Sequence, residues 1–114
     1  MPQFIKQIKE ETTWKESDRN AITVFKTNGL RIVLLALHEG AEMARHTAEG
    51  IISVQVLEGK MKFNTDKQSV ELSKGQILAL HEQIPHSVLA IKETIFLLTL
   101  TTHFGDKDKS FIKP

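Results

Sequence analysis

The sequence predicts an all-β fold, an antiparallel sandwich or barrel for which a jelly roll is the natural architecture. Three observations support this prediction. Apolar residues recur with period two, or in short apolar runs, along most of the chain. Gly, Asn, Asp and Pro separate these segments at short intervals, as turn residues do. The long helical patterns that parallel strand crossovers require do not occur.

About eight strands are expected, and each is bounded by turn residues. Their ranges are 22–26, 30–38, 51–57, 60–64, 69–72, 76–80, 87–91 and 94–102. A chain of 114 residues is long enough for one domain with a single core. We therefore expect one barrel over residues 21–104, followed by a tail at 105–114.

The segment 1–20 precedes the first expected strand and contains the only tryptophan, Trp14. Its pattern leaves three alternatives open: an edge strand, a short helix or an arm exchanged with a second copy. In each case we expect Trp14 to pack onto the sheet, because a large aromatic side chain buries much apolar area there.

Composition narrows the function classes. Hydrophobic residues make up 40% and charged residues 25% of the chain, which is typical of a globular protein. No apolar run approaches the roughly 18 residues of a membrane span, and the first residues lack the apolar segment of a signal peptide. A cytoplasmic protein with no membrane partner is therefore expected. Because 15 basic residues are balanced by 14 acidic ones, no nucleic-acid partner is expected.

The chain contains no cysteine, which excludes disulfides, thiolate metal ligands and thiol catalysis. It also lacks a phosphate-binding Gly-rich loop, a GxSxG nucleophile elbow and an HExxH zinc helix. Any transition-metal site must therefore use imidazole, carboxylate or water ligands.

His46 stands in a segment that resembles the first motif of the cupin family. That motif reads Gly, five residues, His, one residue, His, three or four residues, Glu, six residues, Gly. Gly40, His46 and Gly59 fall in their places. Ala48 stands at the second His position and Ile52 at the Glu position.

His86 stands in a segment that resembles the second cupin motif, which reads Gly, five residues, Pro, one residue, Gly, two residues, His, three residues, Asn. Gly75 and His86 fall in their places. His81, Gln83 and Ala90 replace the Pro, the Gly and the Asn.

The resemblance covers about residues 30–100, with the right spacing between its halves. It implies a small single-domain cupin of the RmlC-like, conserved-barrel type, whose fold is an antiparallel double-stranded β-helix, the cupin jelly-roll barrel. Residues two apart on a strand project to the same face, so inward positions of the two motif strands are expected to line a pocket. These positions are His46, Ala48, Ile52, Val54, His86 and Val88.

The resemblance also implies a divalent transition metal such as Zn, Ni, Fe, Mn or Cu, which three imidazoles and a carboxylate would bind. His46 and His86 keep two of the four ligand positions. The candidate third ligand is His81, five residues before His86, and Glu49 and Glu82 flank the same loops.

Each histidine also has a structural interpretation, in which a ring near a strand end bonds to a backbone carbonyl and binds nothing else. We favour this interpretation for His38, His81 and His103. His46 and His86 differ, because both stand in ligand positions and are expected to share one pocket.

Three hypotheses about function follow, and whether the protein is an enzyme stays open. The first is a cupin that binds a small organic molecule in its barrel. The second is a metal-dependent enzyme of dioxygenase, isomerase or decarboxylase type that uses His46 and His86. The third is a non-catalytic structural or partner-binding jelly roll. A homodimer is expected in each case, because small cupins commonly pair and a strand-rich protein must protect its edges.

Overall fold

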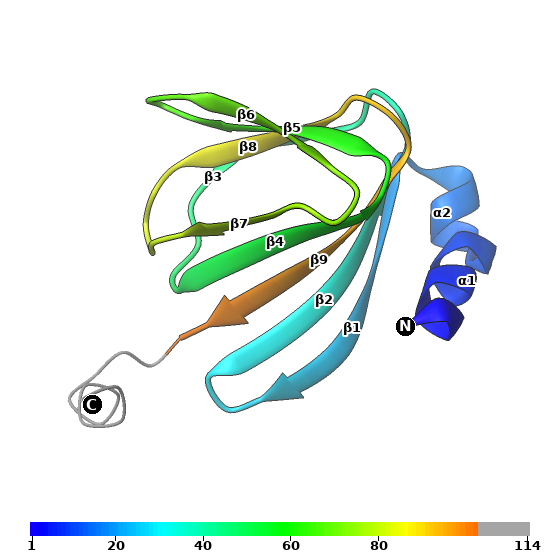
Figure 1. The fold of residues 1–114 in the computed structure, drawn as a ribbon. Coiled ribbons are helices and arrows are strands. Elements are labelled where there is room, and N and C mark those ends of the chain that lie inside the picture. Colours follow the sequence, from blue (N-terminus) through cyan, green and yellow to red (C-terminus); the bar gives the residue numbers. More distant parts are fainter. Residues whose placement is uncertain (103–114) are drawn as a thin grey trace.

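Two antiparallel sheets form the body of the protein in a computed structural model, which describes residues 1–102 (Figure 1). The five-stranded sheet has the order β1 (Arg19–Thr27), β2 (Leu30–Leu37), β9 (Thr94–Thr101), β4 (Ile51–Glu58) and β7 (Ile77–Leu80). The four-stranded sheet has the order β3 (Glu42–His46), β8 (His86–Ala90), β5 (Lys60–Thr65) and β6 (Ser69–Ser73). The predicted all-β jelly roll is confirmed.

Each predicted strand range overlaps one observed strand, but β3 was not predicted. Four of its five residues are exposed and only Met43 is half-buried, so the segment shows no apolar alternation. β3 exists because it pairs with β8 at the edge of the four-stranded sheet. The expected end of the barrel at residue 104, the tail 105–114 and His103 lie outside the described residues.

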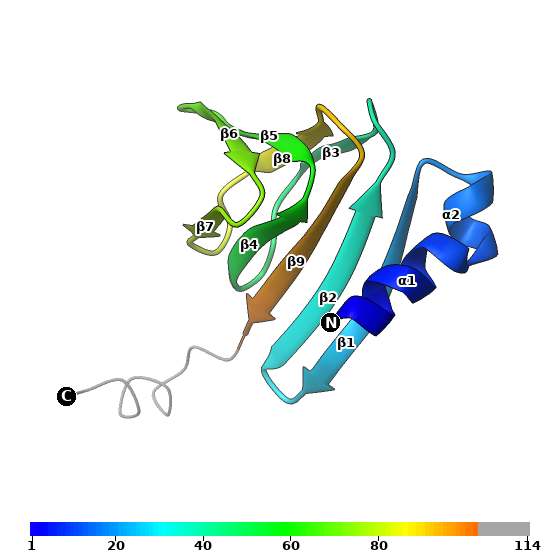
Figure 2. The same cartoon turned by 45° about the vertical axis from the view of Figure 1, so that its right-hand side comes forward.

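The N-terminal segment contains two short helices. Helices α1 (Pro2–Glu10) and α2 (Thr12–Glu16) pack on one face of the five-stranded sheet, opposite to the four-stranded sheet (Figure 2). Pro2 suits the first turn of α1, where its missing N–H has no helical partner to lose. Neither helix is long and apolar enough to cross a membrane.

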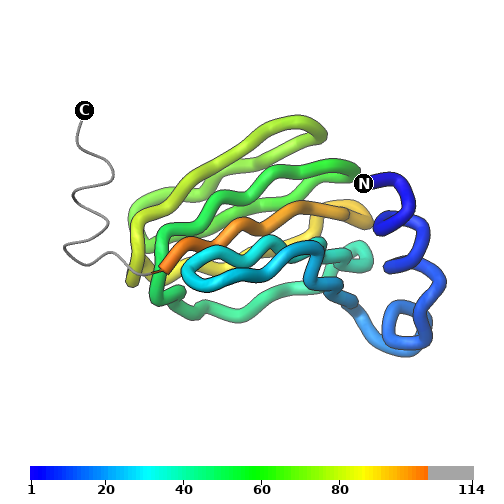
Figure 3. Tube along the Cα trace, turned by 90° about the horizontal axis from the view of Figure 1, so that it is seen from below, coloured from blue at the N-terminus to red at the C-terminus, as the bar shows by residue number. Residues whose placement is uncertain are grey.

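Trp14 is buried on the sheet, as predicted, and it joins the helices to the strands. Trp14 and Ile8 pack against Leu34, Ala36 and Ile95 on the outer face of the five-stranded sheet. Figure 3 shows that the helices gather at one end of the strands, whereas the turn between β1 and β2 lies at the other end.

His38 fixes the position of Trp14. The two rings stack with centroids 3.4 Å apart, and the Nε2 atom of His38 lies 2.8 Å from the backbone oxygen of Trp14. The backbone N–H of His38 donates to the oxygen of Asp18 at 2.9 Å. These contacts agree with the structural interpretation of His38.

The main core fills the space between the two sheets. Its buried residues come from alternate positions, most regularly in β4, where Ile52, Val54 and Val56 are buried and their neighbours are half-buried. The inward residues of β2, Val33, Leu35 and Leu37, form the same core. Because the inward and outward positions of β2 are both buried near its end, the strand reads as a continuous apolar run.

Candidate functional site

His46 and His86 lie side by side at one end of the core. His46 ends β3, His86 begins β8, and the two residues are register partners between these antiparallel strands. Their ring centroids are 4.4 Å apart with a tilt of 60°. The sequence placed both histidines in one pocket, and the structure brings them together.

An irregularity in β3 places His46 on the same face as Met43, where its ring borders the core although the residue is exposed. Met43 pairs with Val88 and His46 with His86, so three steps along β3 match two steps along β8. This extra residue has the form of a β-bulge, a feature that turns side chains at a strand edge. Without it, His46 would lie on the opposite face from Met43, because the two are an odd number of residues apart.

Both imidazoles are held in the same way, through Nδ1, by backbone carbonyls. The Nδ1 atom of His46 lies 2.7 Å from the oxygen of Ala44, and that of His86 lies 2.9 Å from the oxygen of Ile84. A carbonyl oxygen only accepts hydrogen bonds, so each Nδ1 carries the proton. In the neutral ring, Nε2 is then an unprotonated acceptor.

A left-handed turn places the carbonyl that holds His86. Gln83 has φ of 64°, a conformation that favours glycine, and it occupies the position where the cupin motif has Gly. Its backbone N–H donates to the oxygen of Ala48 at 2.9 Å, which ties this turn to the loop after β3. Gln83 therefore adopts a left-handed conformation that a glycine would adopt without strain.

His86 is buried, and its environment disfavours the protonated form. Its ring is stacked on Phe63, with centroids 5.3 Å apart. Burial lowers the pKa of His86, the hydrogen bond to Ile84 opposes that effect, and the nearby His46 adds to the lowering. No buried side-chain N or O atom of residues 1–102 lacks a hydrogen-bond partner. Since Nε2 of His86 has no hydrogen bond within that range, solvent must reach it.

A cavity of about 30 Å³ adjoins the histidine pair. It is lined by Leu35, Met43, His46, Ile52, Val54, Phe63, His86, Val88, Phe96 and Leu98. Five of the six predicted pocket residues are among them. Ala48 is not, and it packs against the core cluster instead. A space of this size holds a water molecule, but no organic molecule of ordinary size.

A larger cavity of about 200 Å³ lies next to the first, between β3 and the strands β1, β2 and β9. Leu35, Met43 and Leu98 line both cavities. The remaining lining residues of the larger cavity are Ala21, Arg31, Val33 and Leu100. We call it the seam cavity. Strand geometry alone could have indicated it, because residues 31, 33 and 35 of β2 share one face of the sheet.

The other candidate metal ligands are not assembled around the histidine pair. His81, Glu49 and Glu82 are exposed. No group of three or more His, Asp or Glu side chains that could hold a metal ion occurs in residues 1–102. Apolar side chains surround the two imidazoles instead, including Ile52 at the carboxylate position. The described residues therefore do not supply a complete cupin ligand set.

Neither a protein-family model nor a curated protein matches this sequence, but solved structures do. SPY1581 from Streptococcus pyogenes, a protein of unknown function, superimposes with a TM-score of 0.71 at 26% identity, over 77% of this chain and 78% of that one. An RmlC-like cupin from Desulfovibrio desulfuricans gives a TM-score of 0.70 at 24% identity, over 81% of this chain and 90% of that one.

An enzyme also matches. Salicylate 1,2-dioxygenase from Pseudoaminobacter salicylatoxidans gives a TM-score of 0.77 at 18% identity, over 87% of this chain and 33% of that one. At such identity, the likeness concerns the fold. The two sheets define a jelly-roll barrel with cavities between them. More particularly, the chain has the fold of a small RmlC-like cupin.

Proposed function

We propose that this protein binds a small organic molecule in the seam cavity, with the Nε2 atoms of His46 and His86 as the polar end of the site. The observation behind this proposal is the pair of anchored imidazoles beside an apolar cavity. Sites for small molecules are generally apolar spaces with a few fixed polar groups, and this arrangement has that form.

The size of the site limits the ligand. The seam cavity of about 200 Å³ is smaller than the roughly 300–1,000 Å³ typical of pockets for drug-sized molecules. The space at the histidines adds only about 30 Å³. A compact metabolite therefore suits the site better than a nucleotide or an oligosaccharide.

Metal-dependent catalysis is the second candidate function, and the tautomers of the two histidines favour it. Metal-ligating histidines commonly donate their other ring N–H to a carbonyl, as both do here. Two neutral imidazoles without a carboxylate make a weak site for a divalent ion, however, so we place organic-ligand binding first.

A ligand screen tests the proposal. Wild-type protein is examined by native mass spectrometry for copurifying compounds and then heated with a library of compact neutral, acidic and basic metabolites. A compound that binds the folded state must raise the melting temperature. Variant Val33→Trp, which fills the seam cavity, should lose that shift. If no compound copurifies and none raises the melting temperature, the proposed function is wrong and the structural alternative is favoured.

A further inference from the structure

We infer that the ligand is a small monocarboxylate with an apolar body, and that Arg31 binds its carboxylate group at the outer end of the seam cavity. This inference rests on the proposed function and specifies the ligand class. Its basis is the sign and position of the charges along the cavities.

Charged side chains at the cavities are cationic. A third hollow, at the turn between β1 and β2, is lined by Lys26, Thr27, Asn28, Gly29, Leu30, Arg31, Leu100 and Thr102. It shares Arg31 and Leu100 with the seam cavity. Among the described residues that line the three spaces, none is Asp or Glu. A bound anion therefore meets no like charge in this lining.

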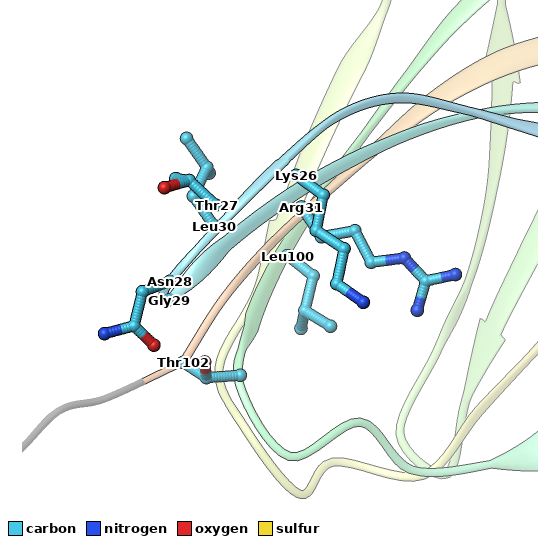
Figure 4. A pocket seen from close by; sticks show the side chains of 8 residues that line it. All are labelled: Lys26, Thr27, Asn28, Gly29, Leu30, Arg31, Leu100 and Thr102. Atoms are coloured by element: carbon cyan, nitrogen blue, oxygen red, sulfur yellow. The ribbon is translucent and has the colours of Figure 1, made fainter.

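Arg31 and Lys26 form one cationic group. They are register partners on β1 and β2, and Arg31 also pairs with Leu100 on β9. Figure 4 shows both side chains extending from the hairpin to the same side as Leu100. Arginine binds a carboxylate through two parallel hydrogen bonds, whereas lysine adds a point charge.

No carboxylate within residues 1–102 is ion-paired with Arg31 or Lys26. Other cations in that range do have partners, such as Arg45, which lies 2.9 Å from Asp66. Arg31 and Lys26 are also exposed. No carboxylate of residues 1–102 therefore neutralises these two charges, and both can interact with a bound ligand.

The histidine side of the site suits an apolar or neutral group. Leu35, Met43 and Leu98 line both the seam cavity and the cavity at the histidine pair. Apart from His46 and His86, the cavity at the histidine pair is lined by apolar side chains, and the Nδ1–H of His86 donates to the oxygen of Ile84. A second carboxylate there would meet no lysine or arginine. A monocarboxylate, with or without a terminal hydroxyl group, is thus preferred to a dicarboxylate.

Three probes of similar length test the inference: octanoate, 1-octanol and octanedioate. Their dissociation constants for the full-length protein are measured by titration calorimetry and by NMR shifts. We expect octanoate to bind at least tenfold more tightly than either alternative. In Arg31→Gln, octanoate binding should weaken at least tenfold, while the matched variant Lys74→Gln, which removes an exposed cation on a distant turn, keeps the wild-type value.

The location of the octanoate site is tested with the variant Ala21→Phe. This substitution places a large side chain over the seam cavity from an exposed position on β1. Loss of octanoate binding in a variant with a wild-type circular dichroism spectrum supports the site. Undiminished binding overturns it.

The possible failures are distinguishable. Equal binding of octanoate and octanol, or an unchanged constant in Arg31→Gln, overturns the choice of a carboxylate and leaves small-molecule binding intact. Absence of octanoate binding overturns the inference, and the wider library then decides the proposed function separately.

Discussion

His46 and His86 face each other across β3 and β8, with ring centroids 4.4 Å apart and each Nδ1 held by the carbonyl two residues earlier. A protonated pair at this distance would be repulsive, so burial and proximity both favour a neutral His86. The stability of the protein should therefore depend on pH through this residue.

We predict that the free energy of unfolding falls as the pH is lowered from 7.5 to 5.5. Because the pKa of His86 is lowered in the folded state, the unfolded chain takes up a proton near pH 6.5 that the folded protein does not. One such proton gives a slope of at most about 1.4 kcal/mol per pH unit. Urea unfolding at several pH values measures it. His86→Gln should flatten the slope, and the exposed-site control His81→Gln should keep it; equal slopes in all three proteins contradict this assignment.

The metal predicted from the cupin resemblance can be measured directly. Two imidazoles without a carboxylate should hold a divalent transition metal weakly, so untagged protein should contain far less than one metal ion per chain after dialysis. Inductively coupled plasma mass spectrometry compares wild type with His46→Ala. A near-stoichiometric metal that His46→Ala removes would instead favour the enzyme hypothesis. It would also mean that a further ligand joins the pair.

Trp14 should contribute strongly to stability. The side chain is 7% exposed and packs with Ile8 against the sheet, so Trp14→Ala leaves a cavity beneath the helices. We expect a loss of about 3 kcal/mol in the free energy of unfolding. Chemical denaturation followed by circular dichroism measures this, with Lys15→Ala, at an exposed position of α2, as the control. A loss below about 1 kcal/mol would show that the helices add little to the barrel.

Alanine substitutions at Gly40 and Gly59 distinguish two energetic costs of replacing a glycine: backbone strain alone, and backbone strain combined with a steric clash. Both have positive φ, 93° and 86°. A Cβ at Gly40 would meet no atom within 4 Å, whereas one at Gly59 would lie 2.1 Å from the backbone oxygen of Glu93. Gly40→Ala should cost about 1 kcal/mol from backbone strain alone, and Gly59→Ala about 3 kcal/mol or more. Similar losses of urea midpoint in the two variants would contradict the close approach at Gly59.

The homodimer remains a prediction. β1 has nine residues and, among the described strands, pairs only with β2, so one of its edges offers free backbone groups. Phe25 on this strand is 49% exposed. Light scattering after size exclusion should give twice the chain mass of 12.9 kDa at micromolar concentration. Phe25→Lys should shift the protein toward monomer if β1 forms the interface, and Ile77→Lys should do so if β7 does. A wild-type monomer would remove the prediction.

The sequence was sufficient for most of the fold. Alternation such as that of Ile52, Val54 and Val56 specifies which face of a strand is buried, because the side-chain period of two is a local property. Turn residues marked the strand ends in the same local way. β3 escaped prediction because its exposed residues carry no such alternation, and only pairing with β8 makes it a strand.

The same distinction between local pattern and long-range structure applies to the candidate site. The sequence alone determined that the chain is all-β and that His46 and His86 stand in related motif positions. Tertiary structure decided that the irregularity in β3 places His46 beside His86, that His81 does not join the pair and that Arg31 flanks the larger cavity. These features depend on strand register and on how strands distant in sequence meet across the barrel. No local pattern of residues specifies such long-range geometry.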